Sequence, residues 1–346
     1  MKFLEGNKMV LKELFIRRPD DFHCHLRNGN MLEKVLWHTA HVFGRAIIMP
    51  NTEPPILTDK DIIDYRNGIE IQLEEQHCYQ FAPLMTVQIT ESTTPKMIEE
   101  ARRVGAVAGK VYPIGVTTNS GNGVRDFEKM HKVFKKMEEV NMLLLLHGEK
   151  PDIFCLNREK EFLNTLIGIH QKFPELKIVM EHITTKEAID MVKKLTNVAA
   201  TITAHHLVLT LDDVVGGLLS PHNFCKPIAK YPKDRNALLE AATSGNPKFF
   251  FGSDSAPHRK DRKECSGGCA GIFSAPVAIQ LLAEIFEKAG RLDKLENFVS
   301  TFGAIFYDLP LNEESITLVK KDWIVPKEYY GIVPFMAGQK LSWQVA

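Results

Sequence analysis

The segment Met142-Leu-Leu-Leu-Leu-His-Gly-Glu149 is the stretch that best indicates the fold. Its apolar run has the length of a fully buried strand and is far shorter than the roughly 18 residues of a membrane helix. The run stops at His147 and Glu149, two side chains able to bind a metal or transfer a proton. A buried strand that ends in such residues is typical of a parallel sheet.

The same pattern recurs along the whole chain. Short apolar runs alternate with stretches of helical period, such as the one that carries Val133, Phe134 and Met137 on one side. The predicted strands cover residues 14–16, 46–49, 80–87, 106–111, 142–146, 177–180, 198–203 and 248–251. Eight strands alternating with helices predict an α/β fold, a (β/α)8 TIM barrel rather than an open sheet.

The chain contains no Pro/Gly/Ser-rich linker, internal repeat or low-complexity tract. We therefore expect a single barrel domain over residues 1–346, with a helical and irregular C-terminal extension over residues 293–346. The first dozen residues look like an extension to which the sequence assigns no role.

Composition excludes several classes of protein. The 43 Lys and Arg residues balance 43 Asp and Glu residues, which argues against broad electrostatic capture of nucleic acid or an anionic membrane. Six scattered cysteines are too few for a disulfide scaffold, and the N-terminal residues carry no signal or transit pattern. These features predict a cytoplasmic protein of enzyme size.

Polar residues follow most of the predicted strands at their carboxyl ends. In chain order they are His23, His25, Arg27, Asn51, Lys110, Tyr112, His147, Glu149, Glu181, His182, Asp254 and His258. The loops at the carboxyl ends of barrel strands form one open face, where catalytic residues of barrel enzymes lie. We therefore expect these side chains to converge.

His23 and His25 could bind one metal ion together. Side chains alternate along a strand, so His23, His25 and Arg27 point to one side, each about 6.5 Å beyond the last. Two strand histidines can equally well fill core space. With His147, His182 and Asp254 at later strand ends, that second interpretation becomes improbable.

Lys110 ends an otherwise apolar strand, where a bare ammonium is costly to bury. A lysine there most often reaches solvent at the barrel rim. The alternative is chemical, because a buried amine of lowered pKa can add CO2 and form a carbamate. That group could bridge the ions of a two-metal site.

Six motifs in one order resemble the dihydroorotases of the amidohydrolase superfamily, specifically the shorter, stand-alone type. They are Asp21-Phe-His-Cys-His-Leu-Arg27, Met49-Pro-Asn-Thr52, Gly109-Lys-Val-Tyr-Pro113, Leu146-His-Gly-Glu149, Glu181-His-Ile-Thr-Thr185 and Gly252-Ser-Asp-Ser-Ala-Pro-His258. The resemblance extends over residues 14–310.

The resemblance implies two zinc ions and a defined reaction. His23, His25 and Asp254 would bind one ion and His147 and His182 the other, with N6-carboxylated (carbamylated) Lys110 and a hydroxide bridging both. Asp254 would also transfer the proton. The reaction is the reversible cyclisation of N-carbamoyl-L-aspartate to L-dihydroorotate in pyrimidine (UMP) biosynthesis. The family further suggests a homodimer.

The resemblance also implies a set of substrate contacts. Arg27, Asn51 and His258 would hold the substrate carboxylate, and the backbone near Leu207 and at Ala270 would contact the ring. Thr117 and Thr118 would belong to a lid formed by residues 113–123, a segment that on sequence alone is better interpreted as a mobile polar loop.

Two other functions fit parts of the pattern. Another cyclic amidohydrolase, such as a hydantoinase, would share the metal site, although Arg27, Asn51 and His258 argue against it. A non-catalytic scaffold relative should lack part of the metal set, which is complete here. Of the other polar residues, we expect 259–263 to form a solvated basic loop and the eight remaining histidines to be mostly ordinary surface or helix residues.

Overall fold

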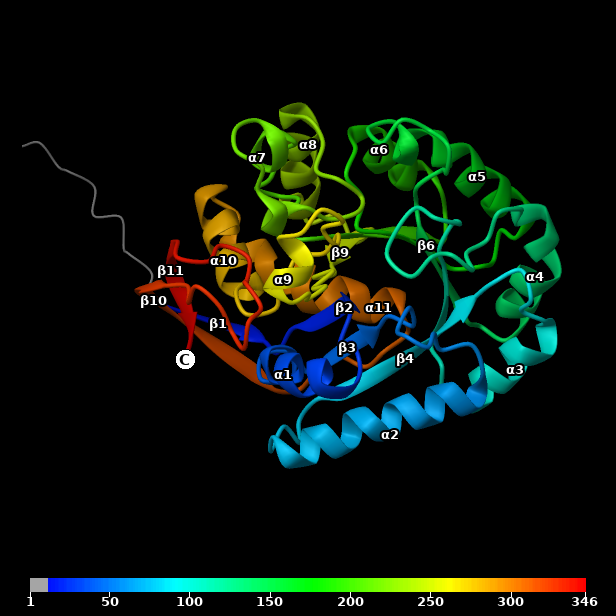
Figure 1. The fold of residues 1–346 in the computed structure, drawn as a ribbon, viewed down its shortest axis with the longest axis horizontal. Coiled ribbons are helices and arrows are strands. Elements are labelled where there is room, and N and C mark those ends of the chain that lie inside the picture. Colours follow the sequence, from blue (N-terminus) through cyan, green and yellow to red (C-terminus); the bar gives the residue numbers. More distant parts are fainter. Residues whose placement is uncertain (1–11) are drawn as a thin grey trace, which may run out of the picture.

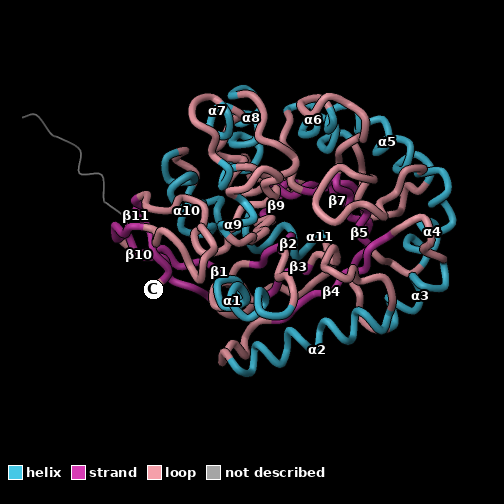
Figure 2. Tube along the Cα trace, viewed as in Figure 1, coloured by secondary structure: helices cyan, strands magenta, loops and turns pink. Residues whose placement is uncertain are grey.

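The structure, a computed structural model, describes residues 12–346. At its centre eight parallel strands follow one another in chain order, and helices surround them (Figure 1, Figure 2). The strands are β2 (Asp20–Cys24), β3 (Arg45–Ile48), β4 (Ala82–Ile89), β5 (Ala108–Val111), β6 (Leu143–His147), β7 (Ile178–Glu181), β8 (Val198–Ile202) and β9 (Phe249–Phe251). The predicted (β/α)8 barrel is confirmed. The predicted N-terminal extension lies largely outside the described residues.

Hydrogen bonds just beyond β2 and β9 complete the ring. The Asp254 amide donates to the His23 carbonyl over 2.8 Å, and the His25 amide donates to the Ser255 carbonyl over 3.0 Å. The barrel interior is packed rather than open, as expected for eight strands. Phe22, Leu145 and Phe250 belong to this inner cluster, which Ala304 and other residues of the C-terminal region extend.

Some of the helices begin at a residue whose side chain accepts a hydrogen bond from a backbone amide of the first turn. Thr94 and Thr185, for example, each accept a hydrogen bond at a helix N-terminus. The α-helices are α1 (Gly29–Ala40), α2 (Asp59–Glu75), α3 (Pro95–Arg103), α4 (His131–Glu139), α5 (Arg158–Lys172), α6 (Lys186–Lys194), α7 (Asp212–Val215), α8 (Pro232–Thr243), α9 (Lys260–Lys263), α10 (Ala278–Lys288) and α11 (Phe302–Phe306). On α4, the predicted stripe of Val133, Phe134 and Met137 is buried.

Two predictions at the ends of the chain are wrong. The run at residues 14–16 is not a barrel strand, because β1 (Glu13–Arg17) pairs with β10 (Ser315–Ile324) in a separate three-stranded sheet. The supposedly irregular tail supplies β10 and β11 (Lys340–Val345). Figure 1 shows this small sheet at the edge of the molecule. The first barrel strand is instead β2, whose sequence Asp-Asp-Phe-His-Cys has little apolar character although all five residues are buried.

Among residues 12–346, none of the helices has the length and apolar character needed to cross a membrane.

Candidate active site

The polar residues that were predicted to converge do so at the carboxyl ends of the barrel strands. His23 lies in β2 and His25 just after it, Lys110 in β5, His147 at the end of β6, and His182 directly after β7. Asp254 follows β9 and is placed by the bonds that complete the ring. The parallel register brings these strand ends to one edge, so residues far apart in the sequence share one site.

The first cluster consists of His23, His25 and Asp254. Nε2 of His25 lies 3.1 Å from Oδ1 of Asp254, and Nε2 of His23 lies 3.4 Å from the same oxygen. One donor atom from each residue falls within 4.8 Å of the other two, and all three residues are buried. This is a donor set with the composition and spacing of a divalent metal site.

The second pair, His147 and His182, adjoins the first cluster. The His182 ring centroid lies 4.8 Å from that of His147 and 4.9 Å from that of His23. Burial lowers the pKa of the imidazoles of His23, His147 and His182. These rings therefore remain neutral, which is the form that binds a metal. His25, whose ring centroid lies 5.3 Å from that of His23, extends these three rings to one continuous row of four histidines.

Lys110 lies among these histidines and does not reach solvent. Its side chain is fully buried, and Nζ has no hydrogen-bond partner among the described residues. Burial lowers its pKa to about 8, against the opposing attraction of Glu181 and Asp254. The rim interpretation of Lys110 is therefore wrong, and its amine can become neutral at a mildly alkaline pH.

Two buried carboxylates, of Glu181 and Glu149, contact ring nitrogens of the site histidines. Nδ1 of His23 lies 2.8 Å from Oε2 of Glu181, which also accepts the Thr201 hydroxyl over 2.6 Å. Nε2 of His147 lies 2.8 Å from Oε2 of Glu149. Both glutamates are buried, so neither is a charge at the barrel rim. Their contacts fix the orientation of the two imidazole rings.

Strained backbone conformations occur at the same place. His182, Asp254 and Arg27 have φ values of 40°, 41° and 60°, in the left-handed region that non-glycine residues rarely adopt. Such conformations persist where the surrounding structure imposes them and tend to cluster at active sites.

The residues predicted to hold the substrate carboxylate border the histidine row. Nη2 of Arg27 lies 3.0 Å from Nε2 of His258, and that nitrogen lies 3.0 Å from the carbonyl oxygen of Ala270. Asn51 is buried and donates to the carbonyl of Thr118 over 3.3 Å. Because Thr118 also contacts the Ala270 carbonyl, five of the predicted contacts form one connected polar group. Leu207 is buried in the segment after β8.

The loop of residues 113–123 contacts this group. The Thr118 hydroxyl donates to the Ala270 carbonyl over 3.4 Å, while Asn119 donates to the Asn51 carbonyl over 3.0 Å. The Thr117 amide donates to the Ser120 hydroxyl within the loop. The loop thus lies between Asn51 and Ala270 instead of projecting freely.

Sequence reasoning missed one residue of this region and misjudged two others. Lys263, expected in a solvated loop, is buried, and its Nζ donates to the carbonyls of Phe224 and Gly271 over 2.9 and 2.6 Å. His205 and His206, expected to be ordinary surface or helix residues, are buried just after β8. The burial of these three residues depends on the packing of distant segments and leaves no local pattern in the sequence.

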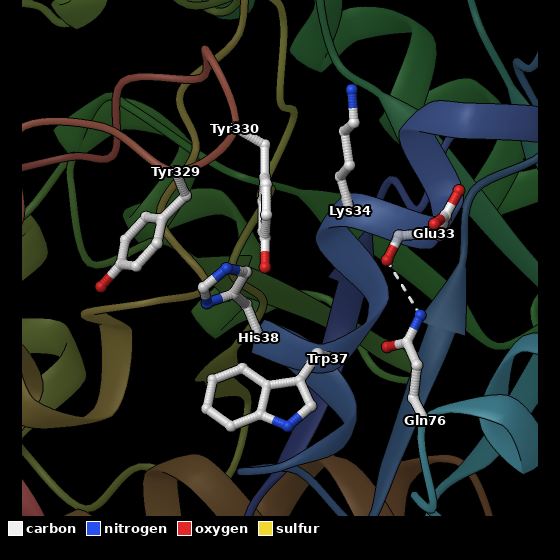
Figure 3. A pocket seen from close by; sticks show the side chains of 7 residues that line it. All are labelled: Glu33, Lys34, Trp37, His38, Gln76, Tyr329 and Tyr330. Atoms are coloured by element: carbon white, nitrogen blue, oxygen red, sulfur yellow. Dashed lines mark hydrogen bonds between the residues drawn. The ribbon is translucent and has the colours of Figure 1, made fainter.

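A cavity of ≈ 620 Å³ lies elsewhere, between α1 and the segment of Tyr329 and Tyr330 (Figure 3). Trp37 and His38 line it together with Glu33, Lys34 and Gln76. None of the predicted site residues is among these seven lining residues. The polar cluster at the strand ends, and not this aromatic hollow, is therefore the candidate active site.

Comparison with known proteins agrees with this geometry. The profile of the amidohydrolase family matches residues 15–330. A dihydroorotase from Aliivibrio fischeri is 48% identical over 341 residues, which cover 96% of this chain and 99% of the relative. The crystal structure of a Saccharomyces cerevisiae dihydroorotase in complex with 5-fluoroorotic acid has a TM-score of 0.91 at 40% identity, covering 97% of this chain and 99% of that one.

An L-hydantoinase from Arthrobacter aurescens shares the fold at a TM-score of 0.82, with 13% identity and coverage of 96% of this chain and 83% of that one. The fold and the row of histidine, lysine and aspartate side chains define the class as (β/α)8 amidohydrolases. Within that class, the chain belongs to the dihydroorotase family.

Proposed function

We propose that this protein is a dihydroorotase that interconverts N-carbamoyl-L-aspartate and L-dihydroorotate in pyrimidine biosynthesis. The observation that carries this proposal is the position of Arg27. Nη2 of its guanidinium lies 3.0 Å from Nε2 of His258, which in turn contacts the Ala270 carbonyl oxygen, at the edge of the row of candidate metal ligands. A guanidinium recognises a carboxylate well, and a carboxylate distinguishes these substrates from simple hydantoins.

The donor set fits a pair of zinc ions, which we assign to this site. His23, His25 and Asp254 would hold one ion and His147 and His182 the other, while carbamylated Lys110 would contact both. The unpartnered Nζ of Lys110 and Nδ1 of His182 support this assignment, because buried polar atoms normally have partners. When bound, the ions polarise the amide carbonyl and lower the pKa of a water molecule.

The environment of Lys110 favours its carbamylation. Burial holds the pKa of its amine at about 8, so a useful fraction is neutral near physiological pH. The neutral amine adds to CO2 through a new N–C bond and releases one proton. The product is an anion with two oxygen donors beside neutral histidines, and its charge would offset part of the positive charge of the zinc ions.

In ring opening, Asp254 accepts a proton from the attacking water and returns it to the leaving ring nitrogen. Ring closure follows the same steps in reverse. The contact of Asp254 with both His23 and His25 fixes its carboxylate for this transfer. Arg27, Asn51 and His258 bind the substrate carboxylate, while the backbone near Leu207 and Ala270 contacts the ring.

The loop that carries Thr117 and Thr118 closes over the substrate. The loop that carries them already contacts Asn51 and Ala270, two residues that we place at the substrate. A closed loop excludes water and completes the hydrogen bonding of the substrate.

We further propose a homodimeric enzyme of the cytoplasm. All six cysteines are free, which suits a reducing compartment, and the dimer is an inference from the family resemblance.

Turnover assays on the zinc-loaded protein test the function. We expect it to open L-dihydroorotate and to leave hydantoin unchanged. An Arg27→Gln variant should raise KM roughly ten- to hundredfold, because a charged hydrogen-bonding group is lost. Arg259→Gln is the matched control, since Arg259 is exposed and forms its ion pair within residues 12–346 with Asp261. Opening of hydantoin, or no turnover at full metal load, would overturn the proposal.

A further inference from the structure

A second cluster of metal-binding side chains lies outside the site described above. His205, His206 and Cys225 each offer a donor atom within 4.8 Å of the other two, and all three are buried. The two histidines follow β8, whereas Cys225 lies in the segment before α8. The residues of this cluster are distinct from His23, His25 and Asp254, which form their own group.

His205 is the unexplained member of the cluster. Its side chain is fully buried, and neither ring nitrogen has a hydrogen-bond partner among the described residues. Buried imidazoles almost always have at least one partner, since leaving a polar atom unpaired is costly. A ligand beside His205 would remove this cost.

The other two residues are arranged around the same position. Sγ of Cys225 lies 3.5 Å from Nε2 of His206 and 3.4 Å from the Pro227 carbonyl oxygen. Nδ1 of His206 lies 2.9 Å from the Thr203 hydroxyl. Nε2 of His206 lies 3.0 Å from the Pro227 carbonyl oxygen, so a metal bound at this nitrogen would replace its hydrogen bond to that carbonyl, while the Thr203 hydroxyl would fix the ring at Nδ1.

We propose that His205, His206 and Cys225 bind a third metal ion, a zinc-like cation that prefers nitrogen and sulfur donors. Two imidazoles and one thiolate form a set of ligands typical of zinc and unsuited to magnesium or calcium. On binding, a metal–sulfur bond forms and the thiol proton of Cys225 leaves for solvent.

The charge state of the cluster agrees with this chemistry. Burial lowers the pKa of both imidazoles, to about 4 for His206, so both are neutral and able to bind. Burial raises the pKa of the Cys225 thiol, which therefore stays protonated until a metal displaces its proton. Metal uptake should consequently release a proton.

The ion would hold the segment that leads to Leu207, the residue directly after His206. Leu207 is one of the proposed substrate contacts, so this consequence rests on the proposed function. The metal site itself does not, because its donors are defined by their own geometry.

Cobalt substitution of the full-length protein tests the site. The proposed catalytic centre contains only nitrogen and oxygen donors, so a thiolate-to-cobalt charge-transfer band in the near ultraviolet must come from a cysteine. The parent protein should carry Cys265→Ser and Cys269→Ser, which removes the thiols of the loop after α9. We expect the band in this parent, with one cobalt more per chain than in its Cys225→Ser variant.

Cys225→Ser should abolish the band and His205→Gln should weaken it, whereas the control Cys78→Ser should leave it unchanged. A parent protein without the band overturns the site, even if the variants fail to fold. A band that survives Cys225→Ser overturns it as well. Turnover of dihydroorotate is recorded separately, so normal turnover without a band rejects only this metal site, and a band without turnover rejects only the proposed function.

Discussion

Lys110 and Glu181 are buried ionisable residues whose hydrogen bonding is incomplete. Nζ of Lys110 and Oε1 of Glu181 have no partner among the described residues, and burial raises the pKa of Glu181 to about 7. Lone charges are expensive to bury unless they are paired or bound to a metal. A cationic centre beside Glu181 would offset this cost, which explains how a core can hold so many polar groups.

Glu181→Gln tests the orienting role of this carboxylate. The amide keeps the volume of the side chain but loses the negative charge beside His23 Nδ1. We expect zinc affinity to fall about ten- to hundredfold, which is typical when such a partner is removed. Competition with a zinc chelator measures the change. Glu175→Gln, a change at an exposed position, is the control, and equal affinities in both variants would contradict the role.

The sequence predicts single residues well where their position depends on strand periodicity. His23 and His25 alternate with Phe22 and Cys24, and the Cys24 thiol does lie away from them, 3.6 Å from the Thr39 hydroxyl. The partner of His23, by contrast, lies 158 residues along the chain. A contact of this kind depends on the packing of the barrel and leaves no local pattern.

At the scale of the elements, three hydrogen bonds join the loop of residues 113–123 to Asn51 and Ala270. Asn51 donates to the Thr118 carbonyl, the Thr118 hydroxyl donates to the Ala270 carbonyl, and Asn119 donates to the Asn51 carbonyl. A loop held by a few hydrogen bonds can open locally, as the lid proposed here requires.

The double change Thr117→Ala with Thr118→Ala should reduce kcat while leaving zinc content intact. The hydroxyls are lost at the proposed substrate contacts, and none of the proposed metal ligands is altered. We expect at least a tenfold fall, because each lost hydrogen bond is worth about 1 kcal/mol or more. Metal analysis of the same sample is the control. Normal turnover would exclude the role of the loop as a lid.

Lys263, at the end of α9, ties two segments together beside the site. Its ammonium donates to the carbonyls of Phe224 and Gly271, and Gly271 directly follows the proposed contact Ala270. Lys263→Met keeps the aliphatic stem and removes both bonds. We expect KM for dihydroorotate to rise severalfold with kcat and zinc content little changed. The exposed Lys260→Met is the matched control. Equal KM values in the two variants would show that Lys263 does not position Ala270.

His38 on α1 should make stability depend on pH. Burial lowers its pKa to about 4, and its ring packs on Phe273, Tyr329 and Trp37, which are uncharged. Repulsion from the neighbouring His41 adds to the lowering of the pKa of His38. As the pH falls below about 6.5, His38 binds a proton in the unfolded state before it does so in the folded state. The free energy of unfolding therefore decreases between about pH 6.5 and pH 4.

Urea unfolding of wild type and His38→Phe at pH 7 and pH 5 measures this effect. We expect wild type to lose roughly 1.4 kcal/mol per pH unit more than the variant in that interval. The same pH dependence in both proteins would show that His38 is not the responsible group.

Elements were predictable from the sequence only where the hydrophobic pattern was strong. Seven of the eight predicted strands overlap barrel strands, because fully buried strands form continuous apolar runs. The barrel strand that the hydrophobic pattern missed is β2. It is rich in polar site residues, so its hydrophobic signal is weak. The apolar run nearest to it belongs to β1, which pairs with β10 near the other end of the chain, a long-range contact with no local signal.

At the scale of the whole molecule, the barrel explains why distant motifs form one site. The parallel order of β2 to β9 brings the carboxyl ends of the strands to one rim, and the bonds between residues 23–25 and 254–255 join the first strand to the last. Every proposed ligand lies on this rim, with Lys110 in the row of histidines. The central claim is that a carbamylated Lys110 joins two zinc ions there.

The most direct test is a Lys110→Ala variant, assayed for zinc content and for cyclisation of N-carbamoyl-L-aspartate, with and without added short carboxylic acids. We predict loss of zinc and of turnover, followed by partial recovery of both when a small carboxylate occupies the vacated space and supplies the missing oxygens. The exposed Lys96→Ala variant is the control. A Lys110→Ala protein that keeps its zinc and turns over at the wild-type rate would contradict the account.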